Sequence, residues 1–258
     1  MKMFGPQDSQ TPRPGASAGP GQFPPVRAPL RLAGTLAFAG FAVSVIAGLF
    51  HADTANANDH PATFVEYARS GIWTAAHLGQ FAGMALLISG LLVLLVILKA
   101  PDGAMAWAAR FGVAAAVAAL ALYASLQAVD GVALKHAVDA WAVVPKPEKP
   151  ARFATAEGIR WLEWGMRSYQ SSVLGAALLL TGAVVVGARR VSALIGYLMA
   201  LSGLAYLAQG WIVGAEGFSP ANTAAILAGI ALILLWSVWL LISAWFGKDA
   251  AARGGRRG

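Results

Sequence analysis

The 258-residue chain contains no cysteine, and only 12% of its residues are charged. The absence of cysteine excludes disulfide bonds, thiolate metal ligands and cysteine nucleophiles. The low charge content argues against a soluble globular protein, in which roughly a quarter of the residues are charged. Because 58% of the residues are hydrophobic and the charges are confined to a few short stretches, the composition indicates a membrane protein.

The sequence also lacks the motifs that would assign a reaction. It has no GxxxxGK[ST] phosphate loop, no GxGxxG dinucleotide motif, no GxSxG nucleophile turn and no HExxH or HxxxH pair. The apolar stretches carry no paired acids of the kind found in proton relays. The net charge is +7, but the cations lie at the ends of apolar stretches and not along one face, so we do not expect nucleic-acid binding.

What the chain does contain is six charge-free stretches, each long enough to cross a bilayer once as a helix. They are residues 32–50, 71–98, 111–129, 168–188, 191–215 and 217–247. We therefore predict an all-α fold, a polytopic membrane bundle of six transmembrane helices with helical extracytoplasmic extensions. An alternative is that the first stretch is a cleaved signal peptide, although its 19 residues exceed the usual apolar region of about 7–15.

Three segments lie outside these stretches and divide the chain. Residues 1–31 are rich in proline and glycine, which predicts a disordered cytoplasmic tail before the transmembrane domain of residues 32–247. Residues 248–258 read as a basic cytoplasmic tail. Residues 130–167 have apolar residues at helical spacing on both sides of a Pro-Lys-Pro turn, so we expect an outer helical hairpin that extends the third and fourth spans.

Lysine and arginine predict the orientation of the chain. The two tails and the 99–110 and 189–190 links together hold 12 Lys or Arg and 3 Asp or Glu, whereas the other segments hold 7 and 9. Because cytoplasmic segments carry the excess of basic residues, we expect a multi-pass protein of the cell (plasma or inner) membrane with both termini cytoplasmic. Most tryptophans lie near span ends, which is typical of an aromatic belt. The expected partner is the lipid bilayer, and a homo-oligomer or another membrane protein is left open.

Polar side chains gather toward the predicted outer ends of four spans, whereas the inner halves are almost entirely apolar. Since polar groups in hydrocarbon are costly, these side chains should face one another or a water-filled cavity. The alternative is that they are interfacial anchors, with an ion pair between residues at i, i+4. The predicted ligand pocket comprises His77, Gln80, Gln127, Asp130, Glu163, Arg167, Gln170 and Gln209.

All four histidines fall on this same predicted outer side. Imidazole is the commonest ligand for zinc, copper and haem iron, so His51, His77 and His136 are candidate ligands for a metal ion or haem, with Asp130 or Glu163 beside them. No two histidines share one helical face, so a metal site would need ligands from several elements. The alternative is that the histidines pack through hydrogen bonds or respond to pH.

The stretches Gly48–Asp53, Thr74–Gln80 and Gln127–Gly131 give the chain a layout that resembles uncharacterised bacterial six-helix integral membrane proteins of unknown function. That resemblance implies a fold but no activity. The favoured function is an outward-facing polar pocket that binds a small ligand, ion or partner. The alternatives are a metal- or haem-dependent membrane enzyme and a small transporter or transporter subunit.

Overall fold

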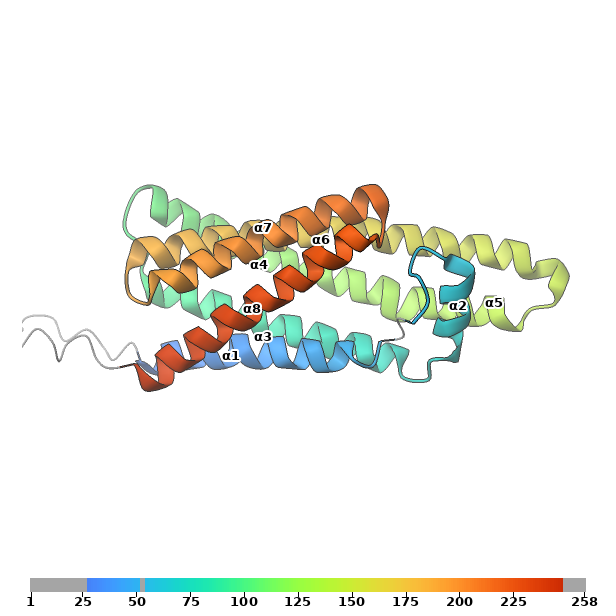
Figure 1. Cartoon of the computed structure of the whole chain (residues 1–258), viewed down its shortest axis with the longest axis horizontal. Coiled ribbons are helices and arrows are strands. Elements are labelled where there is room, and N and C mark those ends of the chain that lie inside the picture. The colour runs from blue at the N-terminus through green and yellow to red at the C-terminus, as the bar shows by residue number, and fades with distance from the viewer. Residues whose placement is uncertain (1–26, 52–53, 248–258) are drawn as a thin grey trace, which may run out of the picture.

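The computed structural model describes residues 27–51 and 54–247, so the predicted C-terminal tail and most of the N-terminal tail lie outside the described residues. The described chain is helical and contains no strand, which confirms the all-α prediction (Figure 1). Its helices are α1 (Arg27–Gly48), α2 (His60–Arg69), α3 (Trp73–Leu98), α4 (Ala104–Ala128), the π-helix η1 (Val129–Leu134), α5 (Lys135–Val143), the 3₁₀ turn η2 (Lys146–Glu148), α6 (Lys149–Ala188), α7 (Ala193–Glu216) and α8 (Pro220–Phe246).

Within the described residues, six helices are long and apolar enough to cross a membrane. Four of them are the single helices α1, α3, α7 and α8. The other two are continuous runs of helix: Ala104–Val143, which joins α4, η1 and α5, and Lys146–Ala188, which joins η2 and α6. The two ends of the described chain meet at one end of the bundle, where the Arg27 guanidinium donates a hydrogen bond to the Gly247 carbonyl at 3.1 Å. We call this the terminal end, and the opposite end, which carries α2 and α5, the hairpin end (Figure 1).

The hairpin end extends well beyond the length that a bilayer requires. With 40 residues, α6 is about 60 Å long, twice the roughly 30 Å of a hydrocarbon core. Its first half pairs with α5 as the predicted helical hairpin, and α2 packs against them around a small apolar core that includes Phe64, Leu134 and Val138. At the other end, residues 27–31, which we placed in the tail, form the first turns of α1.

Small residues bring two pairs of helices into close contact, as expected where lipid offers no hydrophobic drive for association. In the α1–α3 pair, a Cβ atom on Gly40 would lie 2.3 Å from the Leu87 amide nitrogen. In the α6–α7 pair, a Cβ atom on Gly182 would lie 2.5 Å from the Gly196 carbonyl oxygen. Neither position accepts a side chain, so each pair is held at a fixed separation.

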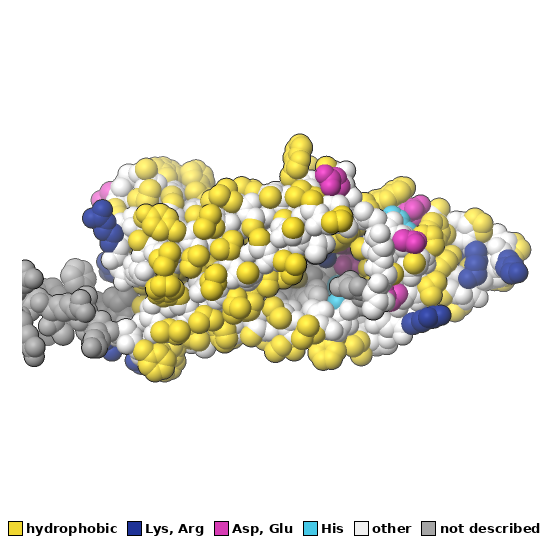
Figure 2. Space-filling view, in the orientation of Figure 1, with side chains coloured by type: hydrophobic (Ala, Val, Ile, Leu, Met, Phe, Trp, Pro, Cys, Tyr) yellow, Lys and Arg dark blue, Asp and Glu magenta, His cyan; other side chains and the backbone are white. Residues whose placement is uncertain are grey.

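Helix α8 crosses diagonally over these two pairs (Figure 1). It contacts α1 close to the terminal end, where a Cβ atom on Gly34 would lie 3.2 Å from the Leu241 Cα atom. Farther along, it packs on α7, with Gly229 beside the Tyr206 ring. The divergence of α8 from α1 leaves the surface hollowed toward the hairpin end, and Figure 2 shows acidic, basic and histidine side chains inside this hollow.

Candidate metal centre

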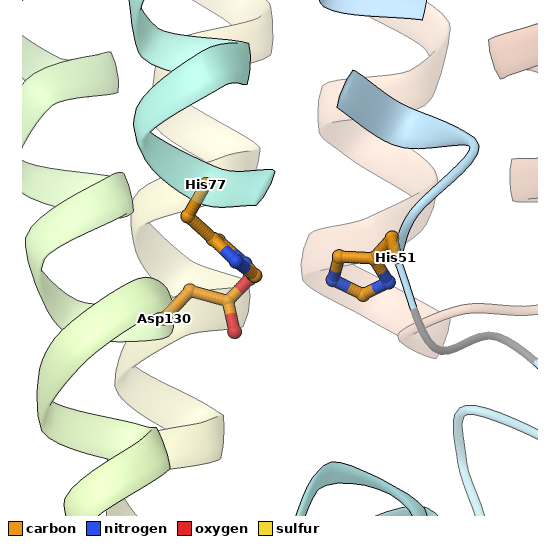
Figure 3. A group of neighbouring side chains, drawn as sticks. All are labelled: His51, His77 and Asp130. Carbon is orange, nitrogen blue, oxygen red and sulfur yellow. The ribbon is translucent and has the colours of Figure 1, made fainter. Parts of the chain in front are cut away.

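Three potential metal ligands from three elements converge at the hairpin end. They are His51 just after α1, His77 in the second turn of α3 and Asp130 in η1 (Figure 3). One ligand atom from each residue lies within 4.8 Å of the other two. The His77 imidazole points toward the Asp130 carboxylate, and the His51 ring faces both from the end of α1.

The hydrogen bond made by His77 fixes which of its ring nitrogens faces the cluster. Nδ1 lies 2.8 Å from the carbonyl oxygen of Trp73, one helical turn earlier. Because a carbonyl only accepts, Nδ1 carries the proton and donates, which leaves the lone pair of a neutral imidazole on Nε2. The ring is 2% exposed. Backbone carbonyls commonly hold metal-binding histidines in this tautomer and orientation.

Asp130 lies on a π-helical segment that α3 holds in place. The indole nitrogen of Trp73 donates to the Asp130 carbonyl at 2.9 Å, and the Thr74 hydroxyl donates to the Gly131 carbonyl at 2.8 Å. A π-helix disturbs the regular backbone hydrogen bonds of an α-helix and is frequent at functional sites. Here the side chains of α3 satisfy two of its carbonyls and thereby fix η1 next to His77.

Gly131 permits this close approach. A Cβ atom at this position would lie 2.6 Å from the His77 Cβ atom and 2.9 Å from its Cγ atom. Such contacts are far shorter than the ordinary van der Waals range of 3.4–4 Å. Any larger residue at this position would push His77 away from Asp130.

Aromatic rings surround His51. Its ring centroid lies 4.5 Å from that of Trp73, 5.0 Å from that of His77 and 6.0 Å from that of Tyr67. The ring is half-buried. These contacts hold the imidazole beside the other two ligands, although it follows the end of a helix.

A chain of charged groups from α6 continues the site. Glu163 is fully buried and accepts hydrogen bonds from Arg160 at 2.8 Å and from Arg167 at 3.0 Å. The Arg167 Nη2 atom lies 3.6 Å from Oδ2 of Asp130, which is also 3.2 Å from His77 Nε2. Asp130 therefore links the histidines to a network of two arginines and one glutamate.

Two buried polar atoms of the cluster have no hydrogen-bond partner. His77 Nε2 is close to the Asp130 carboxylate but lacks the alignment of a hydrogen bond, and Asp130 Oδ1 has no partner either. Asp130 is 1% exposed. Leaving such groups unpaired costs about 1–3 kcal/mol each, and a bound ion or water is an ordinary explanation. The donor set, two imidazoles and one carboxylate, fits a transition metal.

The structure brings several of the predicted site residues together and leaves others apart. His51, His77, Asp130, Glu163 and Arg167 form the connected group described above. Gln80 and Gln127 lie next to it, with a long 3.5 Å hydrogen bond between their side chains. Gln170 and Gln209 are buried on α6 and α7, whereas His136 is exposed on α5 and is not one of the three convergent ligands.

A separate surface hollow of about 520 Å³ opens at the hairpin end. None of the predicted pocket residues lines it. The residues that line it are Asn56, Asn58, Asp59, His60, Pro61, Glu157 and Trp164.

Sequence reasoning missed three residues that build the site. Trp73 was assigned to the aromatic belt, but it is buried and bonded to Asp130. Gly131 had no assigned role. Arg160, three residues before Glu163, had no assigned role either, although its i, i+3 spacing to a glutamate is a signal for a second ion pair.

The histidine–aspartate cluster and its neighbouring ion pairs give the site a definite chemistry, two imidazoles and a carboxylate beside a guanidinium. Comparisons of the chain with protein-family models, with curated proteins and with solved structures find no significant match.

Proposed function

We propose that this chain is an integral membrane protein that binds a divalent transition-metal ion through His51, His77 and Asp130. The observation that carries the proposal is the convergence of these three ligands, two of them buried, with His77 Nε2 and Asp130 Oδ1 lacking hydrogen-bond partners. The proposal narrows the predicted polar pocket to an ion site. Of the predicted metal ligands it keeps His51, His77 and Asp130 and leaves out His136 and Glu163.

The distances support an ion of this kind. Bonds of about 2.0–2.1 Å in a tetrahedral site place neighbouring ligand atoms about 3.3 Å apart. His77 Nε2 and Asp130 Oδ2 are 3.2 Å apart, so this pair needs no rearrangement. No separation in the group exceeds 4.8 Å, so binding requires a shift of at most about 1.5 Å. His51 follows the end of α1 and is only half-buried, so we assign that shift to its side chain.

A single ion fits the site better than haem. The Asp130 carboxylate lies 3.2 Å from His77 Nε2, which is the space that a porphyrin bound to that nitrogen would occupy. Two histidines and one carboxylate form a ligand set of the type found in zinc enzymes and non-haem iron enzymes. Three protein ligands leave a coordination position open for water or another ligand.

We propose further that the hairpin end faces the outside of the cell and that both termini are cytoplasmic. The distribution of lysine and arginine supports this orientation, with the two-residue link Arg189-Arg190 as its clearest marker. The metal site would then lie near the outer boundary of the membrane.

The proposal is tested by metal binding to the purified, tag-free protein in detergent, since a histidine tag would itself bind metal. After removal of bound metal, the protein is titrated with Zn²⁺ and with Co²⁺, and metal content is measured by elemental analysis. We expect one equivalent per chain. His77→Ala and Asp130→Asn should each lower the affinity at least about 100-fold, because a ligand is lost from a three-ligand site.

His136→Ala is the matched control, since His136 lies at the same end of the molecule but is exposed and outside the cluster. It should bind metal like the unmodified protein. Equal binding by the His77→Ala and His136→Ala proteins would refute the proposed site, provided that size-exclusion profiles and helical circular dichroism show both to be folded.

A further inference from the structure

The charges around the proposed metal ion leave a positive imbalance. Among the described residues of this network, Asp130 and Glu163 carry one negative charge each, and Arg160 and Arg167 one positive charge each, so they sum to zero when both histidines are neutral. A divalent cation raises this sum to +2. The acidic groups and Arg160 are almost completely buried, and uncompensated charge in such an environment is costly.

Arg167 is the cation best placed to share a counter-ion with the metal. Its Nη2 atom lies 3.6 Å from Asp130 Oδ2, and a metal bound to that oxygen at about 2.0–2.2 Å would be no more than about 6 Å from this nitrogen. A small oxyanion spans this distance, with one oxygen on the metal and another on the guanidinium. The planar guanidinium suits carboxylates and phosphates in particular.

Arg167 also differs from Arg160 in its accessibility. The Arg167 side chain is 22% exposed, whereas that of Arg160 is 3% exposed. Both guanidinium groups donate a hydrogen bond to Glu163, and that of Arg160 also approaches the Ala57 carbonyl. The surface is hollowed nearby, between α8 and α1, and charged and histidine side chains are visible there (Figure 2).

From these observations we infer that the metal site takes a small carboxylate or phosphate as its additional ligand, with one oxygen on the open metal position and another on Arg167. This inference rests on the proposed metal binding. It defines the class of molecule that the site recognises, an oxyanion from solution or the phosphate of a lipid headgroup. The two sources share the same chemistry and are distinguished by experiment.

The experiment uses the full chain loaded with Co²⁺, whose visible absorbance changes when its ligands change. The protein is titrated with inorganic phosphate, with acetate, and with detergent micelles that contain phosphatidic acid. We expect a saturable spectral change in at least one titration. A response to phosphate or acetate assigns a soluble oxyanion, and a response to phosphatidic acid alone assigns a lipid phosphate.

Substitution of Arg167 separates a binding role from a merely structural one. In Arg167→Gln, oxyanion affinity should fall about tenfold or more, because a hydrogen bond between charged groups is lost. Co²⁺ affinity should stay equal or rise, because a neighbouring positive charge is removed from the cation and from Asp130. Damage to the fold would instead lower both affinities. Arg167→Lys, which keeps the charge, should retain part of the oxyanion affinity.

Arg152→Gln is the control, because Arg152 is an exposed arginine on the same helix. It should behave like the unmodified protein in every titration. Failure of the chain to bind Co²⁺ would refute the metal site itself. Binding of Co²⁺ without any spectral response, or an equal response in the Arg167→Gln protein, would refute the oxyanion inference and leave the metal site standing.

Discussion

Replacement of Gly131 by alanine tests whether the contact between η1 and α3 sets the geometry of the metal site. The added Cβ atom would lie 2.6 Å from the His77 Cβ atom, whereas ordinary contacts begin at 3.4 Å. The two backbones must therefore separate by about 0.8 Å. Since metal–ligand distances tolerate about ±0.2 Å, His77 and Asp130 should no longer bind one ion together without strain.

We expect Gly131→Ala to lower metal affinity about 10- to 100-fold, the range typical for loss of the groups that orient a ligand. Overpacking should also destabilise the fold by about 1–3 kcal/mol. Co²⁺ titration and thermal unfolding measure the two effects. Gly158→Ala is the matched control, because a Cβ atom on Gly158 meets nothing within 4 Å. Unchanged metal affinity in Gly131→Ala would show that the site does not depend on this contact.

Two further predictions follow from the described contacts and from the proposed orientation. Trp73→Phe removes the hydrogen-bond donor to the buried Asp130 carbonyl. It should lower the free energy of unfolding by about 1–3 kcal/mol and metal affinity by about tenfold. The control is Trp161→Phe, at an exposed tryptophan, which should change neither quantity in the same assays. Because the chain has no cysteine, Val143→Cys at the hairpin tip and Ser192→Cys near the opposite end give unique labelling sites. A membrane-impermeant maleimide should label the first in intact cells and the second only after permeabilisation, and the reverse pattern would invert the proposed topology.

The membrane-spanning helices were predictable because long charge-free runs leave few other ways to satisfy backbone amides in lipid. The ion pair between Glu163 and Arg167 was predictable for a similar local reason, since residues at i, i+4 are neighbours on a helix. The approach of Arg167 to Asp130 has a related reason, because both residues lie where their spans leave the apolar stretch. Each of these features depends on residues that lie within one helix or at the same depth in the membrane, and both can be read from the sequence.

The ligand set itself depends on tertiary contacts that no local pattern reveals. The π-helical turn at Asp130 is held by hydrogen bonds from Trp73 and Thr74, which are 57 residues away in the chain. Exposure of His136 follows from burial of Leu134 and Val138 on the opposite face of α5, since a residue two positions away points about 200° around a helix. His136 is therefore a candidate by residue type alone, and the buried face of this short helix excludes it from the cluster.

The position of Arg167 in the fold explains why its substitution should lower the affinity for the oxyanion and not the affinity for the metal ion. The proposed metal ligands come from α1, α3 and η1, and the close α1–α3 contacts and the hydrogen bonds of Trp73 and Thr74 hold these elements together. Arg167 comes from α6, which packs tightly on α7 and also contacts α4 and η1. Loss of the Arg167 guanidinium removes its ion pair with Asp130 but leaves the contacts among α1, α3 and η1 in place. Because the metal ligands and Arg167 come from different helices, substitution of Arg167 should lower oxyanion affinity and leave metal affinity intact. If these polar residues only stabilised the fold as one cluster, the same substitution would lower both affinities.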